Sequence, residues 1–480
     1  MMSILEYNEV DWAAFREALG DVPSFDNPRL LRAKSRDFFW YSPILARKLD
    51  GCIADLVVRP RTQEELVRAL KLAYSSRVPV TLRGRGSGNY GQAVPLEGGL
   101  VIEMTKLDQI FEIGEDFVRV EAGCNMHSLN EALRAEGKEL PIFSSTHRIA
   151  TIGGFIGGGS GGIGSIEHGM LRDRGNIIQI TALSLEAEPV RHEFTGDGVN
   201  LLHHAWGING VITELTLKTV PKCDWINCIA SFPTYRAAFE AGLALGHRRD
   251  LRRKLVCTVD AGFTRYFEKL KGRIGARHHL LLSLIDRQDV PAFDALVRQC
   301  GGTTDLCLDE QAMAAEGLPH VFEFSFNHTT LQVLNVEKSA TYLQVRVPAP
   351  IDVTRVDAVR EILGSEVLMH HEFVRLNDAL VAIDLPVIFY TTDERLYQIM
   401  QIYEDHGLPV SDPHTFIIEG GGMKNADYQR LACKKRLDPL GLLNPGKSKE
   451  WPRVKDMDPQ SIEALQVGTR SDETEDERER

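Results

Sequence analysis

Several features that would place a protein in a functional class at once are missing from this 480-residue sequence. No apolar run approaches the length of a membrane span, and residues 1–15 lack the basic start and apolar core of a signal peptide. The formal net charge is −12, so the chain offers no basic footprint for nucleic acid or an anionic membrane. We therefore expect a cytoplasmic protein with no membrane span and no nucleic-acid partner.

Paired cysteine motifs are also missing. The eight cysteines are scattered along the chain, and no two of them form a CxxC pair. In a chain of this size such spacing is typical of reduced, mostly packed thiols rather than of a disulfide framework. The cysteines therefore support the expectation of a cytoplasmic protein.

The sequence does have the composition of an ordinary soluble globular protein, with 43% hydrophobic and 25% charged residues. Its length is enough for two or three domains. Strand and helix patterns alternate from residue 55 to about 221, where Thr62 and Glu65 form a capping-box signature that predicts a helix. Beyond residue 221, longer polar–apolar alternations predict an antiparallel sheet with helices on one side.

Glycine is concentrated in two segments. The first, TLRGRGSGNYGQAVPLEGG at residues 81–99, needs either positive φ angles or a very close backbone approach. Residues 86–91 satisfy the GxGxxG pattern, but Pro95 and the paired glycines behind it cannot begin the helix that a Rossmann loop requires. A P-loop is excluded as well, since no Gly-Lys-Ser/Thr follows.

The second segment, residues 144–178, carries ten glycines. Successive backbone amides that are free of Cβ atoms can form a concave anion site without a helix. Two such segments in one α/β region predict an extended ligand, with a diphosphate at one segment and an aromatic system at the other.

With their neighbours, these segments resemble the vanillyl-alcohol oxidase/para-cresol methylhydroxylase (PCMH) superfamily of flavoproteins, which bind FAD. The resemblance implies an α+β fold and places the FAD diphosphate at the first glycine segment. The matching segments, in the family's order, are DLVVRPRTQEELVRAL (55–70), RGRGSGNYGQAVP (83–95), ATIGG (150–154) with the glycines after it and RDRGNI, WGINGVITELTL (206–217) and DPLGLLNPGK (438–447).

The resemblance also implies a domain organisation. Residues 1–221 are expected to form a PCMH-type FAD-binding domain of two α/β subdomains. Residues 222–404 are expected to form a substrate (cap) domain, an antiparallel sheet with helices. Residues 405–456 would return to the FAD-binding site, and the charged residues 457–480 are expected to be a disordered tail.

Positions that match the family give the expected FAD contacts. Several members carry a histidine in the diphosphate loop that bonds covalently to the flavin, and Ser87 stands at that position here. A hydroxyl has no comparable ring nitrogen, so we predict non-covalent FAD, with Cys124 and His147 as alternative points of attachment. The implied cofactor-binding residues are Arg83, Gly84, Arg85, Gly86, Ser87, Gly88, Asn89, Gln92, Thr151, Gly153, Gly154, Gly158, Gly161, Gly162, Ile212, Asn444 and Lys447.

One branch of the superfamily, the D-lactate, glycolate and 2-hydroxyglutarate dehydrogenases, is the nearest in pattern. Its EHGIGxxK segment corresponds to residues 419–424, which keep Glu419 but have Gly420 where the branch has histidine. The metal-binding GHxGDGNxH segment of the branch has no counterpart in the chain, and a zinc site needs such ligands closed around the ion. We therefore predict no metal site, and 2-hydroxy-acid specificity does not transfer directly.

Residues beyond 221 supply candidates for handling the proton and charge of a substrate. His328 and His414 are the candidate acid–base groups, and Glu419, which matches the glutamate of the family segment, is a further candidate catalytic residue. For His328, which follows the alternating pattern FEFSF at 322–326, a solvated loop histidine is the alternative. Arg375 is a candidate clamp for a carboxylate, with an intradomain salt bridge as its alternative.

Two further strand patterns carry polar residues on one face. His370 and Glu372 share a face, which fits an incomplete metal pair or, as we expect, a surface strand with ordinary polar residues. Tyr342, Gln344 and Arg346 also project from one face, and beneath a cap this row would line the pocket.

Three functional hypotheses follow from the resemblance. The first is an FAD-dependent oxidase or dehydrogenase that oxidises the C–OH group of a small hydroxylated substrate, such as a hydroxy acid or sugar-like alcohol, and passes the electrons to oxygen or another acceptor. The second is an oxidase of an amine or an aromatic alcohol. The third is a flavin-binding electron-transfer or scaffold subunit without a substrate of its own. The oligomeric state stays open, with a homodimer as one alternative.

Overall fold

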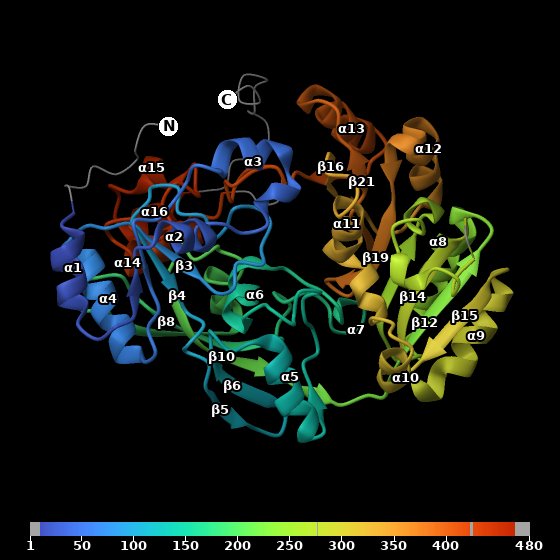
Figure 1. The fold of residues 1–480 in the computed structure, drawn as a ribbon, viewed down its shortest axis with the longest axis horizontal. Helices are drawn as coiled ribbons and strands as arrows, with labels where there is room; N and C mark the ends of the chain where they lie inside the picture. Colours follow the sequence, from blue (N-terminus) through green and yellow to red (C-terminus); the bar gives the residue numbers. More distant parts are fainter. Residues whose placement is uncertain (1–9, 276, 423–425, 466–480) are drawn as a thin grey trace.

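The computed structural model describes residues 10–275, 277–422 and 426–465. Two groups of strands and helices lie side by side, one built mainly from the chain before residue 221 and one mainly from the chain after it (Figure 1). Helices and largely antiparallel sheets are mixed in both groups, in agreement with the predicted α+β class. None of the helices in the described ranges has the length and apolar character needed to cross a membrane.

The first sheet of the N-terminal group has the strand order β1-β2-β4-β3, in which β2 and β3 run parallel to β4. Helix α4 packs Leu66 and Leu70 against the apolar residues of this sheet. Thr62 Oγ1 accepts a hydrogen bond from the backbone N–H of Glu65, which confirms the predicted N-cap. The elements are α1 (Trp12–Leu19), β1 (Ser24–Phe25), α2 (Pro28–Lys34), α3 (Pro43–Leu49), β2 (Leu56–Val58), α4 (Gln63–Ser75), β3 (Val80–Arg83) and β4 (Leu100–Glu103).

The second sheet of this group is antiparallel, with the order β5-β6-β10-β8-β9. Apolar residues of α5 and α6 pack with those of β6 and β8 in one core. The first turn of α6 therefore lies between this sheet and the first glycine segment. The elements are β5 (Ile110–Ile113), β6 (Phe117–Glu121), α5 (Met126–Ala135), β7 (Lys138–Glu139), α6 (Ile152–Gly158), α7 (Ser165–His168), β8 (Ile177–Leu183), β9 (Arg191–Thr195), β10 (Val211–Lys218) and β11 (Val220–Pro221).

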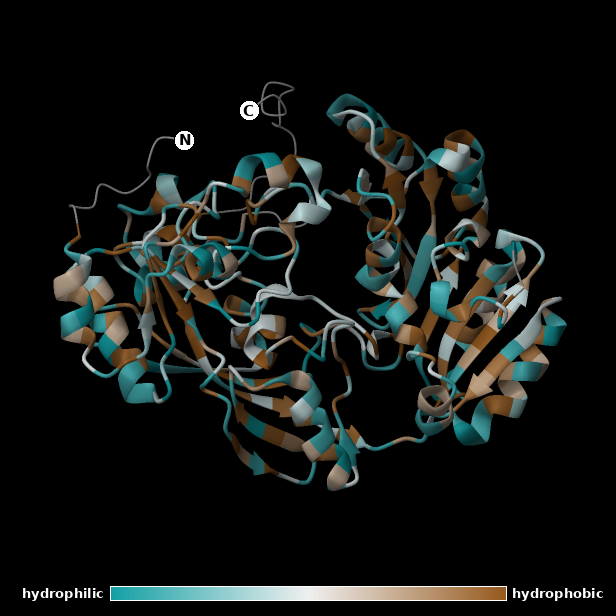
Figure 2. Ribbon diagram, viewed as in Figure 1, coloured by the Kyte–Doolittle hydropathy of each residue, from teal (hydrophilic) through white to brown (hydrophobic). Residues whose placement is uncertain are grey.

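An eight-stranded antiparallel sheet forms the second group, with the order β15-β12-β14-β13-β19-β20-β17-β22. Its strands are rich in apolar residues (Figure 2) because both of its faces are covered. In β14, Leu281 packs with α8 and α9 on one face, whereas Leu280 and Leu282 pack with α11 on the other. A further sheet has the order β16-β21-β18. The elements are β12 (Trp225–Phe232), α8 (Tyr235–His247), β13 (Arg253–Val259), β14 (His279–Asp286), α9 (Val290–Gln299), β15 (Thr303–Leu308), α10 (Glu310–Ala315), α11 (Phe326–Leu334), β16 (Ala340–Tyr342), β17 (Gln344–Val347), α12 (Val353–Leu363), β18 (Val367–Leu368), β19 (His370–Leu376), β20 (Ala379–Asp384), β21 (Val387–Phe389), α13 (Asp393–Asp405) and β22 (Val410–Ser411).

Two expectations about this sheet are wrong. The surface strand expected around His370 is buried, because β19 lies inside the sheet and His370, His371 and Glu372 are each at most 1% exposed. The strand expected at FEFSF is a 3-10 turn followed by helix α11, since Phe326 has a φ of 49° and ends any extended run. His328 consequently lies in the first turn of α11 rather than at the end of a strand.

The C-terminal segment returns to the first sheet, where Val80 donates a hydrogen bond to the Leu442 carbonyl and accepts one from the Asn444 backbone. Part of the expected disordered tail is folded, because α16 buries Ile462 against the returning helices. Residues 466–480 of that tail lie outside the described residues. The elements are α14 (Tyr428–Leu437), α15 (Trp451–Val454) and α16 (Pro459–Glu463).

Candidate functional site

A cavity of about 670 Å³ is lined by both glycine segments and by residues of the second group of elements. Such a volume is typical of a ligand site. On the glycine side, the lining includes fifteen of the seventeen cofactor-binding residues expected from the sequence. These are Arg83, Gly84, Arg85, Gly86, Ser87, Gly88, Asn89, Gln92, Thr151, Gly153, Gly154, Gly158, Gly161, Gly162 and Ile212.

The first glycine segment is packed so tightly that side chains are excluded. A Cβ atom on Gly84 would lie 2.1 Å from Thr151 Oγ1, and one on Gly88 would lie 2.4 Å from Gln92 Oε1. Gly86 has a φ of +69°, and a Cβ atom there would overlap the guanidinium group of Arg83. The loop therefore needs glycine both for positive φ and for close approach, as the sequence predicts.

The second glycine segment forms another part of the cavity lining. Thr151 caps α6 by accepting a hydrogen bond from the Gly154 N–H at 3.2 Å. A Cβ atom on Gly162 would lie 2.3 Å from the Phe143 carbonyl oxygen. The lining contributed by both segments is rich in glycine, and glycine backbone without a Cβ atom can supply the contacts that a phosphate group needs.

Asn444 and Lys447, the remaining two expected contacts, are not among the residues that line the cavity. Both are buried and hold the loop from behind. The Asn444 side-chain amide donates to the carbonyl oxygens of Gln92, at 2.8 Å, and Trp206, at 2.7 Å. Lys447 Nζ donates to the carbonyl oxygen of Gly91 at 2.6 Å. Their role in the structure is to shape the loop.

Part of the opposite wall comes from the predicted row of polar residues at 342–346, although the single strand expected there is divided into β16 and β17, which belong to different sheets. Gln344 and Arg346 line the cavity. Tyr342 is fully buried behind them, and its hydroxyl accepts a hydrogen bond of 2.7 Å from Asn89. Gln344 donates to the hydroxyl of Tyr90, whose pKa is raised to about 12 by burial. These tyrosines are therefore neutral hydrogen-bonding groups at neutral pH.

Several cavity residues were not predicted. Asp37 lines the cavity although nothing in its sequence context marks it, and burial raises the pKa of its carboxyl group. Trp206 and Tyr90 stack with ring centroids 6.2 Å apart. The indole nitrogen of Trp206 and the side-chain oxygen of Asn327 are buried without a hydrogen-bond partner among the described residues. These orphaned polar atoms in a cavity lining are those that a bound ligand would satisfy.

Only His328 among the four candidate catalytic residues lines the cavity. Its Nδ1 lies 2.8 Å from Glu323 Oε2, and Glu323 is in turn 3.6 Å from the guanidinium Nε of Arg148. The contact is an ion-pair distance and does not have the geometry of a hydrogen bond, so the carboxylate acts on the ring through its charge and leaves Nε2 for another partner. The arrangement is that of an imidazole beside a carboxylate at a cavity wall.

The structure does not bring the other three to the cavity. Arg375 lies on the opposite face of β19 from the lining residues Val374 and Leu376, and donates to the carbonyl oxygens of Gly246 and Asp378. The predicted carboxylate clamp is therefore not formed.

Glu419 and His414 have partners inside the protein. Glu419 accepts hydrogen bonds from the Ser448 hydroxyl and the Lys449 backbone, so it fixes the C-terminal segment. His414 is 3% exposed, with Nδ1 2.7 Å from Ser42 Oγ, and burial lowers its pKa.

The alternative points of flavin attachment lie away from this cavity as well. Cys124 is 3% exposed, and burial raises the pKa of its thiol to about 12. His147 lines a neighbouring cavity of about 500 Å³ and has a pKa lowered by burial to about 4. Ser87, the position of the covalent histidine in related proteins, faces the main cavity.

Comparisons with known proteins agree with this geometry. Residues 54–183 match the FAD binding domain family. The glycolate oxidase subunit GlcD of Bacillus subtilis (strain 168) is 32% identical over 180 residues, which are 35% of this chain and 37% of that protein. The D-lactate dehydrogenase of Archaeoglobus fulgidus is 29% identical over 198 residues, covering 38% of this chain and 43% of that protein. The matches thus span about two-fifths of the relatives' length.

A solved structure of an alkyldihydroxyacetonephosphate synthase is similar over most of the chain, with a TM-score of 0.69, 13% identity, and coverage of 92% of this chain and 87% of that one. At that identity the likeness shows the fold. The family match and the relatives confirm the resemblance to PCMH-type FAD-linked proteins, and FAD is the cofactor of the domain.

Proposed function

We propose that the chain is an FAD-dependent oxidoreductase that oxidises the C–OH group of a small hydroxylated substrate. The observation that carries the proposal is the composition of the lining of the cavity of about 670 Å³. One side is formed by the two glycine segments, and the other holds the polar residues Asn327, His328, Gln344 and Arg346. A cofactor site therefore continues into a space with hydrogen-bonding groups, as a redox enzyme requires.

In this proposal residues 1–221 and 405–456 hold the cofactor, and residues 222–404 cover it. The glycine segments would hold the diphosphate, and Asn444 and Lys447 keep the first segment in shape. Bound FAD supplies a two-electron acceptor for the hydride of the substrate C–H bond. His328 Nε2 would accept the proton of the substrate hydroxyl, with Glu323 at Nδ1 stabilising the imidazolium that forms.

The charge and polarity of the second wall favour a particular range of substrates. Arg346 and Gln344 would bind a carboxylate or hydroxyl group, whereas Val374, Leu376 and Ile383 form an apolar surface beside them. A hydroxy acid or a sugar-like alcohol fits the polar residues. The apolar surface supports a second candidate, an aromatic alcohol or an amine with an apolar group.

The test is an anaerobic visible spectrum of the purified full-length protein during addition of hydroxy acids, sugars, aromatic alcohols and amines in separate pools. Bleaching of the flavin band by the first two pools supports the main proposal, and bleaching by the last two supports the second candidate. A flavin band that no pool bleaches favours an electron-transfer or scaffold subunit. Admission of oxygen to the bleached sample then distinguishes an oxidase from a dehydrogenase.

The proposal also includes non-covalent FAD, because Ser87 is the residue at the position of the covalent histidine. Acid precipitation should release all flavin into the supernatant. Flavin that stays with the precipitated protein would show a covalent bond to another residue.

A further inference from the structure

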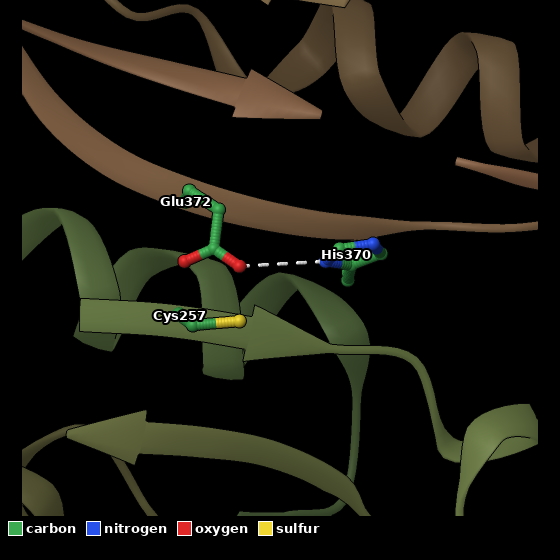
Figure 3. Close-up of side chains that lie close together, drawn as sticks. All are labelled: Cys257, His370 and Glu372. Atoms are coloured by element: carbon green, nitrogen blue, oxygen red, sulfur yellow. Dashed lines mark ion pairs between the residues drawn. The ribbon is translucent and has the colours of Figure 1, made fainter. Parts of the chain in front are cut away.

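Three polar side chains that do not line the main cavity come together inside the eight-stranded sheet. Cys257 lies on β13, and His370 and Glu372 lie on the neighbouring strand β19 (Figure 3). Cys257 is paired directly with Glu372 in the antiparallel register, and His370 is two residues before Glu372 on the same face. One potential ligand atom of each residue lies within 4.8 Å of the other two.

These side chains are buried, and several of their polar atoms have no hydrogen-bond partner among the described residues. Cys257 and His370 are 0% exposed and Glu372 is 1% exposed. Neither ring nitrogen of His370 has a hydrogen-bond partner among the described residues, and the same holds for Glu372 Oε2. Glu372 Oε1 accepts a hydrogen bond of 2.6 Å from the backbone of Phe326. Buried polar atoms of this kind usually have partners in native proteins, so each of these needs an explanation.

We propose that Cys257, His370 and Glu372 bind one Zn²⁺ ion. Thiolate, imidazole and carboxylate are the ligand types of protein zinc sites. A thiolate and a carboxylate together neutralise the charge of a divalent ion, which suits a site buried from bulk solvent. The three protein ligands leave the fourth tetrahedral position for one enclosed water molecule.

The distances are compatible with an ion between the three residues. Bonds of 2.0–2.3 Å to a tetrahedral zinc ion place ligand atoms about 3.3–3.8 Å apart. His370 Nδ1 and Glu372 Oε1 are 3.6 Å apart, which is already in that range. Cys257 then needs only a small side-chain adjustment, since all three atoms lie within 4.8 Å of one another. In the absence of metal, burial and the neighbouring Glu372 raise the pKa of the Cys257 thiol well above its ordinary value.

The proposed ligands differ from those suggested by the resemblance to metal-binding dehydrogenases. Glu419, the acidic residue of that pattern, is hydrogen-bonded to Ser448 and Lys449, and the GHxGDGNxH segment is absent. The sequence-based prediction of no metal site depended on that segment. Cys257 lies 113 residues before His370 in the numbering, so no local motif reveals the cluster.

The site would act on the cavity through Phe326. This residue has a positive φ of 49°, begins α11 and lines the cavity, and its N–H contacts Glu372. An ion bound to Glu372 would fix the strained start of α11, and with it His328 in the first turn. The metal would thus position the cavity wall and need not touch the substrate.

The test is metal analysis of the purified full-length protein, with zinc-edge X-ray absorption, which reads the ligands without using activity. We expect about one zinc per chain, with one sulfur neighbour at about 2.3 Å and the remaining neighbours nitrogen or oxygen. Wild-type protein that holds no transition metal, and takes up none after dialysis against zinc chloride and gel filtration, would overturn the proposal. A bound metal without a sulfur neighbour would overturn it as well.

Variants assign the ligands. Cys257→Ser should remove the sulfur signal, and His370→Asn should reduce the zinc content at least tenfold. Cys433→Ser is the matched control, because Cys433 is also buried but lies on α14. It should keep both zinc and sulfur signal. Persistence of the sulfur signal in Cys257→Ser contradicts the assignment, and the wild-type spectrum decides the proposal even where a variant fails to fold.

Discussion

Lys447 Nζ donates a hydrogen bond of 2.6 Å to the backbone oxygen of Gly91, across 356 residues of sequence. The contact joins the C-terminal segment to the loop that carries the first cluster of glycines. Lys447 is fully buried, and burial lowers its pKa to about 7, against the opposing influence of the Asp37 carboxylate. The Lys447 side chain therefore makes a hydrogen bond to the loop backbone and also interacts electrostatically with Asp37, an acidic residue of the cavity lining.

Replacement of Lys447 by methionine should weaken FAD binding at least tenfold, or about 1.4 kcal/mol. The reason is that the Gly91 carbonyl loses its partner and the buried Asp37 loses one of its two neighbouring cations, so that Arg83 alone offsets its charge. FAD affinity is measured by titration of the flavin-free protein with FAD, followed by fluorescence. Lys48→Met, on the exposed surface of α3, is the control and should bind FAD as the wild type does. Equal affinities would show that the contact has no part in shaping the loop.

Gly84→Ala should remove FAD binding and lower stability, since a Cβ atom would lie 2.1 Å from Thr151 Oγ1 and force the two glycine segments apart. Overpacking of this kind typically costs about 1–3 kcal/mol of unfolding free energy. Flavin content after purification and chemical denaturation provide the two measurements. Gly51→Ala has open space around its Cβ position and should leave both unchanged. A Gly84→Ala protein with full flavin content would contradict the close packing of the loops.

The glycine segments and the N-cap at Thr62 could be predicted from the sequence because local backbone needs determine those residues. The catalytic candidates could not, because their positions depend on strand register. Neighbouring residues on β19 point to opposite faces of the sheet, so Val374 lines the cavity and Arg375 does not. No sequence pattern shows which of the two faces borders the cavity.

Burial was equally hard to predict. His370 is inside the protein only because β19 is an interior strand of a sheet with both faces covered, a fact of long-range topology. Asp37 and Cys257 are brought to their sites by the same kind of long-range packing. FEFSF alternates like a strand, yet the contacts of Phe322 and Phe324 in the core override that preference.

Stability should fall as the pH drops from about 6.5 to about 4, in part through His147. Burial, with smaller contributions from His127 and Arg148, lowers the pKa of His147 from 6.5 to about 4. In this range the unfolded chain binds a proton that the folded protein does not, so unfolding becomes more favourable at lower pH. The contribution of this residue is of the order of 1–3 kcal/mol.

Denaturant unfolding at several pH values measures that slope. His147→Gln should flatten it over this range, whereas His192→Gln on strand β9 should leave it unchanged. An unaltered slope in His147→Gln would mean that other groups account for the acid sensitivity.

His328→Gln should slow the reduction of the flavin by substrate about 10²–10⁴-fold, the usual contribution of a general base. The flavin content should stay normal, because His328 is on α11 and the proposed flavin contacts are on the glycine segments. The rate of anaerobic bleaching is followed by stopped flow with the substrate that the pools identify.

Glu323→Gln removes the carboxylate 2.8 Å from Nδ1 and should give a smaller loss of rate together with a shifted pH profile, because the imidazolium is stabilised less. His192→Gln is again the control. A His328→Gln protein that is reduced at the wild-type rate and with the wild-type pH profile would exclude His328 as the base.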